Sequence, residues 1–153
     1  MNEPNVNNIE ILFEQYKMFV ETAEQVTNRR QKLNQYYITA LTSLIGIPYA
    51  LGIDIFKEIS FLTIFIGFIG CLMSVLWIVN LISAKQLNKA KFEIIQEIEI
   101  RLPYKLYTKE WKLLAEGRDS KVYLEATKVE LLVPIVLGLP YLGLFIYALN
   151  QLT

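Results

Sequence analysis

The chain has 153 residues, of which 54% are hydrophobic and 20% charged, and its 15 Lys and Arg balance 15 Asp and Glu. This apolar excess is above that of typical soluble domains, and a net charge of zero argues against bulk attraction to nucleic acid. Histidine is absent, which excludes Ser-His-Asp and Cys-His catalytic sites and histidine-based metal sites.

The first predicted segment, residues 1–35, is polar and has the pattern of a long cytoplasmic helix. Apolar residues recur every seven positions in two series, one beginning at Ile9 and the other at Leu12. Such a heptad pattern predicts an amphipathic helix that packs on a partner. Arg30 falls on the apolar seam, where its charge needs an ionic partner or water. The segment has no short apolar core behind a basic start, so we expect no signal peptide.

Three apolar runs predict membrane spans at residues 36–53, 60–83 and 129–153, the first two forming a hairpin over residues 36–84. The first two spans contain no charged residue, and the third contains none after Glu130. Each run has about the length that a helix rising ~1.5 Å per residue needs to cross a hydrocarbon core ~30 Å thick. The first span is the least apolar, because it also contains Thr, Ser, Gly and Pro. We therefore expect an integral membrane protein of the all-α class.

The positive charges indicate how the chain is oriented. If the N-terminus is cytoplasmic, three crossings leave every Lys and Arg except Lys57 on the cytoplasmic side. This asymmetry follows the positive-inside rule. We therefore expect a helical head, formed by residues 1–35 and 85–128, in the cytoplasm and the C-terminus outside.

The cytoplasmic segment 85–128 has the pattern of further helices. One amphipathic helix is expected to continue the second span and to end before Pro103. Its predicted apolar stripe has four members: Leu87, Ala90, Ile94 and Ile98. A shorter helix from about residue 108 to 116 is expected to stop at Gly117, and Ser120 is a candidate N-cap for the helix that enters the third span.

Motifs for catalysis are missing from the sequence. It contains neither a G-x-x-x-x-G-K phosphate loop nor a G-x-G-x-x-G motif. The spans have no ionisable residue in their interiors, which disfavours coupled transport. Three carboxylates on the cytoplasmic helix could hold a divalent ion, but a solvated helix face is the favoured interpretation: Glu93, Glu97 and Glu99. We expect no enzyme activity, no cofactor and no metal.

Small residues and prolines in the spans bear on helix packing. Gly67, Gly70 and Ser74 follow one another at three- and four-residue spacing, so another helix can approach closely there. That helix belongs either to the same subunit or to a neighbouring one. Pro134 and Pro140 each remove a backbone hydrogen bond from the third span, which predicts a kink that serves either gating or static shape.

A conducting form would need more than one copy of the chain. Three helices cannot enclose an aqueous pore, so several copies would have to surround a common axis. The heptad helix offers a means of association. Four hydroxyl-bearing residues of the spans either line a wet passage or bond back to their own helix: Thr39, Thr42, Ser43 and Thr63.

Two blocks of sequence flank the predicted hairpin. The first is YKMFVETAEQVTNRRQ at residues 16–31, followed by Asn34, Tyr36 and Tyr37. The second is Glu116-Gly117, then Tyr123, Thr127, Val129-Glu130 and Val133-Pro134. In order and position the two blocks resemble the RipA family of octameric bacterial membrane proteins, whereas the middle of the chain is similar only in hydropathy.

The resemblance implies a ring-like homo-oligomer, expected to be an octamer, in the bacterial plasma (inner) membrane. It places Arg29, Arg30 and Asn34 at the cytoplasmic mouth, with Glu116 and Glu130 as candidate partners of the arginines within or between subunits. Similar small proteins encoded by phages and their satellites act in anti-phage defence by forming membrane-disrupting pores.

From these observations we expect a membrane-disrupting or pore-forming effector of anti-phage defence. Its candidate partners are further copies of itself, the lipid bilayer and a phage-derived trigger protein, and no nucleic acid. One alternative is a non-conducting oligomeric scaffold or regulatory factor, which an apolar or lipid-filled lumen would favour. The other is a small housekeeping channel, which a continuous polar passage would favour.

Overall fold

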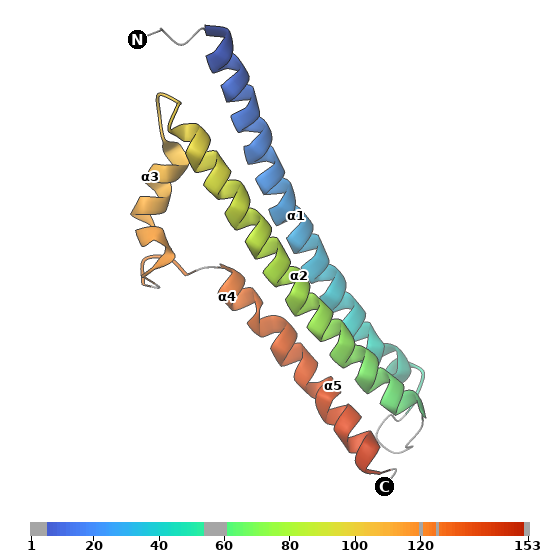
Figure 1. Ribbon diagram of the computed structural model, residues 1–153. Coiled ribbons are helices and arrows are strands. Elements are labelled where there is room, and N and C mark those ends of the chain that lie inside the picture. The colour runs from blue at the N-terminus through green and yellow to red at the C-terminus, as the bar shows by residue number, and fades with distance from the viewer. Residues whose placement is uncertain (1–5, 54–60, 120, 125, 152–153) are drawn as a thin grey trace. The chain divides into compact units, whose positions relative to one another are not determined.

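A computed structural model of the chain describes residues 6–53, 61–119, 121–124 and 126–151. Within these residues all regular structure is helical and there is no strand (Figure 1). In chain order the elements are α1 (Val6–Ala50), α2 (Phe61–Glu99), α3 (Leu106–Leu113), the 3-10 helix η1 (Ala115–Gly117), α4 (Ala126–Glu130) and α5 (Leu132–Asn150). The predicted all-α class is confirmed.

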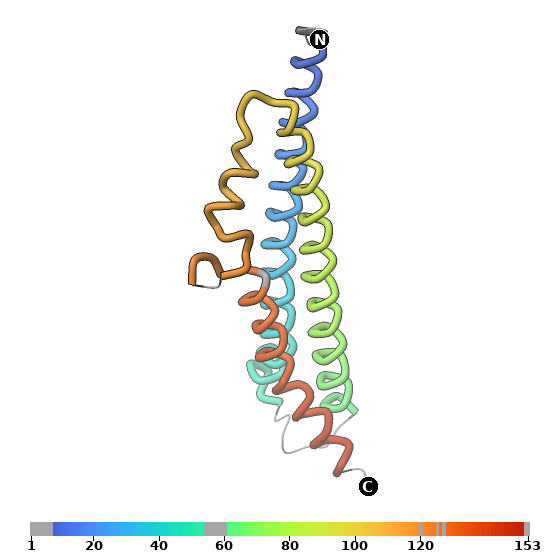
Figure 2. Tube along the Cα trace, turned by 60° about the vertical axis from the view of Figure 1, so that its left-hand side comes forward, coloured from blue at the N-terminus to red at the C-terminus, as the bar shows by residue number. Residues whose placement is uncertain are grey.

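The chain forms two compact units, and both long helices contribute to each of them. The head unit contains the chain up to Arg29 together with residues 83–126. The membrane unit contains residues 30–82 together with the chain from residue 127 onward. In each unit the portions of α1 and α2 run antiparallel, side by side (Figures 1 and 2).

The core of the membrane unit lies where α1, α2 and α5 meet. All three helices contribute to its buried cluster, which consists of Tyr37, Leu41, Ile66, Trp77, Leu81, Tyr141 and Leu144. Close packing of these side chains therefore stabilises the contact of the three helices.

The small residues of α2 bring α5 close within one chain. A Cβ atom added to Gly67 would lie 2.9 Å from the backbone of Phe145, and one added to Gly70 would overlap the ring of Tyr141. The buried Ser74 faces Gly138, where an added Cβ would lie 2.9 Å from its Oγ. Of the two arrangements left open by the sequence, the structure therefore shows contact within the subunit for these positions.

Two helices in the described part of the chain are long and apolar enough to cross a membrane. They are α2 and the helix that runs from Lys128 to Asn150. In α2 the uncharged stretch ends near residue 83, so the rest of that helix, up to Glu99, lies beyond the span. α1, which contains most of the segment predicted as the first span, is not among them.

The two prolines predicted to kink the third span occupy different positions. Pro134 is buried near the start of α5, and Pro140 is exposed inside it. A proline at position 134 has no N–H to donate to the carbonyl of Glu130, and α4 and α5 are accordingly separated at Leu131. Leu131 keeps helical dihedral angles (φ −67°, ψ −22°), so the chain changes its bonding there without leaving the helical path.

The head unit uses a different face of α2 from the one predicted. Leu87 and Ile94 of the predicted apolar stripe are 50% and 40% exposed, whereas Ile95 and Glu99 are fully buried. The prediction was wrong because it counted only apolar side chains as inward-facing. The face that packs on α1 includes polar residues, among them Asn88.

The shorter cytoplasmic helix begins and ends earlier than predicted. α3 ends at Leu113, and η1 follows it. Ala115 and Glu116 both have positive φ values (52° and 54°), a conformation that α-helices do not contain. The helix therefore cannot run on to residue 116, although Gly117 (φ 70°) does lie in the left-handed region expected of a residue past a helix end. The predicted N-cap, Ser120, lies outside the described residues.

Candidate functional site

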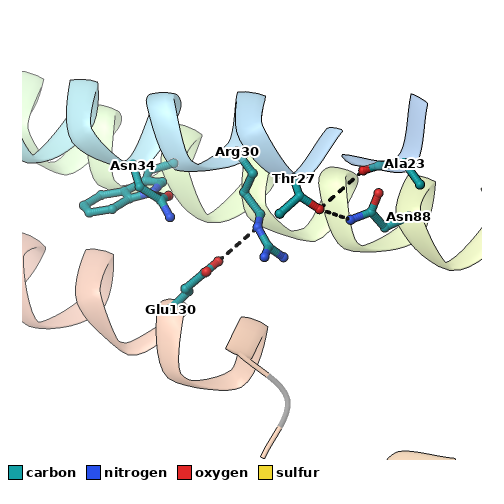
Figure 3. A network of polar contacts seen from close by, with 7 residues as sticks. Ala23, Thr27, Arg30, Asn34, Asn88 and Glu130 are labelled. Atoms are coloured by element: carbon teal, nitrogen blue, oxygen red, sulfur yellow. Dashed lines mark hydrogen bonds and ion pairs between the residues drawn. The ribbon is translucent and has the colours of Figure 1, made fainter. Parts of the chain in front are cut away.

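Arg30 and Glu130 form an ion pair inside the membrane unit. Nε of Arg30, on α1, lies 3.3 Å from Oε2 of Glu130, the last residue of α4 (Figure 3). The two side chains are 12% and 25% exposed. Water and salt screen such a shielded pair less than a surface pair. The structure thus brings together one of the predicted arginines and one of its two predicted partners, and the contact ties α1 to the start of the apolar helix that runs from Lys128 to Asn150.

One helical turn further along α1, Asn34 receives a hydrogen bond from α2. The indole Nε1 of Trp77 donates to Oδ1 of Asn34 at 2.7 Å. The indole ring is 1% exposed and stacks on Tyr37, with ring centroids 5.5 Å apart and an interplanar angle of 8°. A buried indole N–H needs an acceptor, and Asn34 supplies it. Sequence reasoning placed Asn34 at the cytoplasmic mouth but did not identify this partner.

Two tyrosine hydroxyls of the membrane unit form further polar contacts. Nδ2 of Asn80 donates to the hydroxyl of Tyr37 at 2.9 Å. The hydroxyl of Tyr141, on α5, donates to the backbone carbonyl of Leu41, on α1. Polar groups shielded from water are costly when they are unpaired, so these bonds stabilise the contact of α1 with both other helices.

The remaining predicted mouth residues do not join the Arg30–Glu130 pair. Arg29 is exposed and belongs to the head unit. Glu116 lies in η1, where Oε2 is 2.7 Å from Nη2 of Arg118. In the structure of a single chain, Glu116 is therefore paired locally rather than with either arginine of α1.

Polar side chains also link α1 and α2 in the head unit. Nζ of Lys91 donates to Oγ1 of Thr22 at 2.9 Å, and Nδ2 of Asn88 donates to Oγ1 of Thr27 at 3.1 Å. The Thr27 hydroxyl in turn donates to the carbonyl of Ala23 at 3.3 Å (Figure 3). These directional bonds fix which residues of the two helices lie opposite one another.

Glu99 is a buried carboxylate that holds α3 in place. Its side chain is fully buried and accepts N–H bonds from Tyr107 at 2.8 Å and Thr108 at 2.9 Å. The hydroxyl of Thr108 also donates to it at 2.8 Å, and that of Tyr16 at 3.1 Å. Lys105, at the N-cap position of α3, gives no side-chain cap. Glu99, at the end of α2, therefore accepts the hydrogen bonds from the first turn of α3 that the side chain of an N-cap residue normally accepts.

These contacts change the acidity of the groups involved. Burial alone would raise the pKa of Glu99, but four hydrogen bonds to its carboxylate outweigh burial and lower the pKa below the ordinary value. The pKa of Tyr16 is raised, first by burial and then by its bond to Glu99. The carboxylate thus stays ionised and the phenol protonated, which is the pairing that the hydrogen bond requires.

The three glutamates predicted to share a solvated helix face do not behave alike. Glu93 is exposed and lies 3.8 Å from Nζ of Lys89, and Glu97 is exposed. Glu99 is buried instead, so the prediction was wrong for this residue. Its position four residues after Ile95, on the packed face of α2, was the available signal. The part of the chain that the structure describes contains no group of three His, Cys, Asp or Glu side chains that could hold a metal ion.

The comparisons with known proteins give one match. The profile of the octameric membrane protein family matches residues 13–150, which include most of both units. The chain matches no curated protein. It also matches no solved structure. The family resemblance seen in the sequence is confirmed, and it accords with the two apolar helices that are long enough to cross a membrane. The chain is therefore a membrane protein that belongs to the octameric membrane protein family.

Proposed function

We propose that the protein assembles as a homo-octamer in the bacterial inner membrane and opens the bilayer, as an effector of anti-phage defence. In this proposal the chain crosses the membrane three times, with the head unit in the cytoplasm and the C-terminus outside. The distribution of Lys and Arg supports this orientation, since only Lys57 falls on the outer side. The role needs no catalytic step.

The observation that carries the proposal is the contact of α1 with both apolar helices. Tyr37 stacks on Trp77 of α2, and the backbone carbonyl of Leu41 accepts a hydrogen bond from the hydroxyl of Tyr141 of α5. With α2 and α5 in the membrane, α1 would lie at the same depth as they do. Yet α1 is not apolar enough to count as a span by itself. Other copies of the chain, or water held between them, would shelter it from lipid.

Packing within one chain also favours an opening between copies. Gly67, Gly70 and Ser74 bring α2 against α5, and Trp77 and Leu81 fill the space next to α1. Side chains at native packing density leave no path for ions along the inside of such a bundle. An aqueous passage would therefore have to form where several membrane units meet, which accords with a family of octamers.

Two experiments test the proposal. The full-length protein is purified in detergent, its mass is measured by native mass spectrometry, and it is reconstituted into liposomes that contain a self-quenched dye. We expect an octamer and protein-dependent dye release. An octamer without release would support the scaffold instead, and a monomer would contradict both. The defence role predicts fewer plaques on bacteria that express the chain than on bacteria with a stop codon at its start; equal plaque numbers across a phage panel would remove that role.

A further inference from the structure

The side of α1 that points away from the core of the membrane unit is polar or small. Its residues recur at alternating spacings of four and three positions, which places them along one side of a helix. They are Lys32, Tyr36, Thr39, Ser43, Gly46 and Ala50, and all are exposed except Ser43, which is half-buried. We call this set the outward face of α1. The core residues Tyr37 and Leu41 lie on the opposite side of the helix.

The other two helices of the membrane unit have bulky apolar outward sides. Exposed side chains include Phe68, Leu72, Val75 and Val79 on α2, and Val136, Leu139, Leu142 and Ile146 on α5. Hydrocarbon accommodates such side chains, whereas it offers no hydrogen-bond partner to a hydroxyl and no solvation to an ammonium group. The membrane unit therefore has two sides suited to lipid and one that is not.

We propose that the outward face of α1 lines a water-filled passage on the axis of the octamer, and that a ring of Lys32 side chains at its cytoplasmic end makes the passage prefer anions. This inference rests on the proposed function and names the lining and the ion class. What faces α1 is the same face of the other copies, with water between them. The apolar sides of α2 and α5 then turn toward lipid.

The chemistry of the face suits contact with water along its length. Thr39 and Ser43 present hydroxyl groups, which hydrate readily. Neighbouring Thr42 directs its hydroxyl to its own helix, donating to the carbonyl of Ile38 at 2.8 Å. A Cβ added to Gly46 would meet no atom within 4 Å, so the space beside it is open. Beyond the ring of lysines the lining is thus neutral, with hydroxyl groups at Tyr36, Thr39 and Ser43 and small residues at Gly46 and Ala50.

Lys32 supplies the charge that decides which ions enter. Its side chain is exposed, and it forms no ion pair or hydrogen bond with the residues that the structure describes. Glu130, a carboxylate of the same unit, is already matched by Arg30. Rings of Lys or Arg attract anions and exclude cations from a pore mouth. In an octamer, eight such ammonium groups surround one opening.

Selectivity is tested by the reversal potential of the reconstituted protein in a planar bilayer under a KCl gradient. With the native chain, the reversal potential is expected to lie between zero and the equilibrium potential of chloride. Lys32→Gln should move the reversal potential toward zero, and Lys32→Glu should move it past zero, toward the equilibrium potential of potassium. Lys112→Glu, at an exposed lysine of α3, is the matched control and should leave it unchanged. A cation-selective native protein, or a Lys32→Glu variant with unaltered selectivity, would overturn the role of Lys32.

Placement of the face is tested separately from conduction. In a Cys71→Ser background, Thr39→Cys is compared with Val75→Cys for reaction with a membrane-impermeant thiol reagent and for disulfides between copies. We expect Thr39→Cys to react or cross-link, and Val75→Cys to do neither. If Thr39→Cys reacts or cross-links in an octamer that passes no current, the outward face of α1 does line the axis, and the proposed opening of the bilayer fails. If the octamer passes current while only Val75→Cys reacts, the proposed opening of the bilayer stands, and the placement of the outward face of α1 on the axis fails.

Discussion

The ring of Tyr141 occupies the space that a side chain at position 70 would need, so glycine at this position lets the ring of α5 pack directly against α2. We predict that Gly70→Ala destabilises the membrane unit by about 1–3 kcal/mol, because the added methyl group overlaps that ring. The thermal unfolding midpoint of the protein in detergent measures the effect. Gly46→Ala is the matched control: it meets nothing within 4 Å and should leave the midpoint unchanged or slightly raised. Equal midpoints for both variants would contradict the close packing.

Removing either member of the Arg30–Glu130 pair should weaken both the fold and the oligomer. Arg30→Ala leaves the partly shielded carboxylate of Glu130 without this ion-pair partner, and Glu130→Ala leaves the partly shielded guanidinium of Arg30 without that carboxylate. We expect each to lower the octamer fraction on native gels and to reduce stability by roughly 1–3 kcal/mol. The double variant should lose less than the sum of the two, which a double-mutant cycle measures. Additive losses would mean that the two residues do not act together.

Replacing Glu99 by Gln should loosen α3. The amide NH₂ cannot accept the bonds from the N–H groups of Tyr107 and Thr108, so one of those donors loses its acceptor. The expected loss of stability is about 1–3 kcal/mol. Hydrogen exchange at the two amides reports the change directly. Glu97→Gln, at an exposed position on the same helix, should leave their exchange rates as they are. Unchanged protection in both variants would exclude a capping role.

Acid should loosen the same part of the head. The pKa of Glu99 is lower in the folded protein than in the unfolded chain, where it is about 4.3. The ionised carboxylate therefore stabilises the head above that pH, and the stabilisation is lost as the pH falls below it through the lowered pKa. Hydrogen exchange at α3, measured from pH 6 to pH 3 and corrected for the intrinsic pH dependence of exchange, should show this loss. Glu99→Gln should show much less of it, since its amide does not titrate.

The helices and the membrane character could be predicted from the sequence because both depend on local patterns. Long runs of apolar residues favour helices that cross a membrane, and α2 and α5 contain two such runs. Heptad spacing placed Ala23 and Tyr37 on the packed side of α1, where both are buried. These inferences need no knowledge of which segments meet in space.

Contacts between distant residues were harder to predict, and the reasons differ. In the sequence Glu99 resembled an exposed charged residue. The hydrogen-bond donors that satisfy its carboxylate belong to α1 and α3, and no pattern in the neighbouring sequence indicates them. Trp77 gave no sign of its acceptor, since Asn34 lies 43 residues away in the sequence. Glu130 could be proposed for Arg30 because a charge on an apolar seam must be compensated and because the family resemblance places both residues near the cytoplasmic mouth. Sequence patterns thus revealed which groups need partners, but the partners were identified by the fold.

The continuity of α1 has a mechanical consequence. It is one helix from Val6 to Ala50, and between Arg30 and Ile45, within the membrane unit, it contains neither glycine nor proline, the residues at which helices most often bend. A rotation of this stretch at Arg30 would therefore turn Thr39 in the same sense. The hydroxyl groups of the unit would be reoriented together, without a hinge between them.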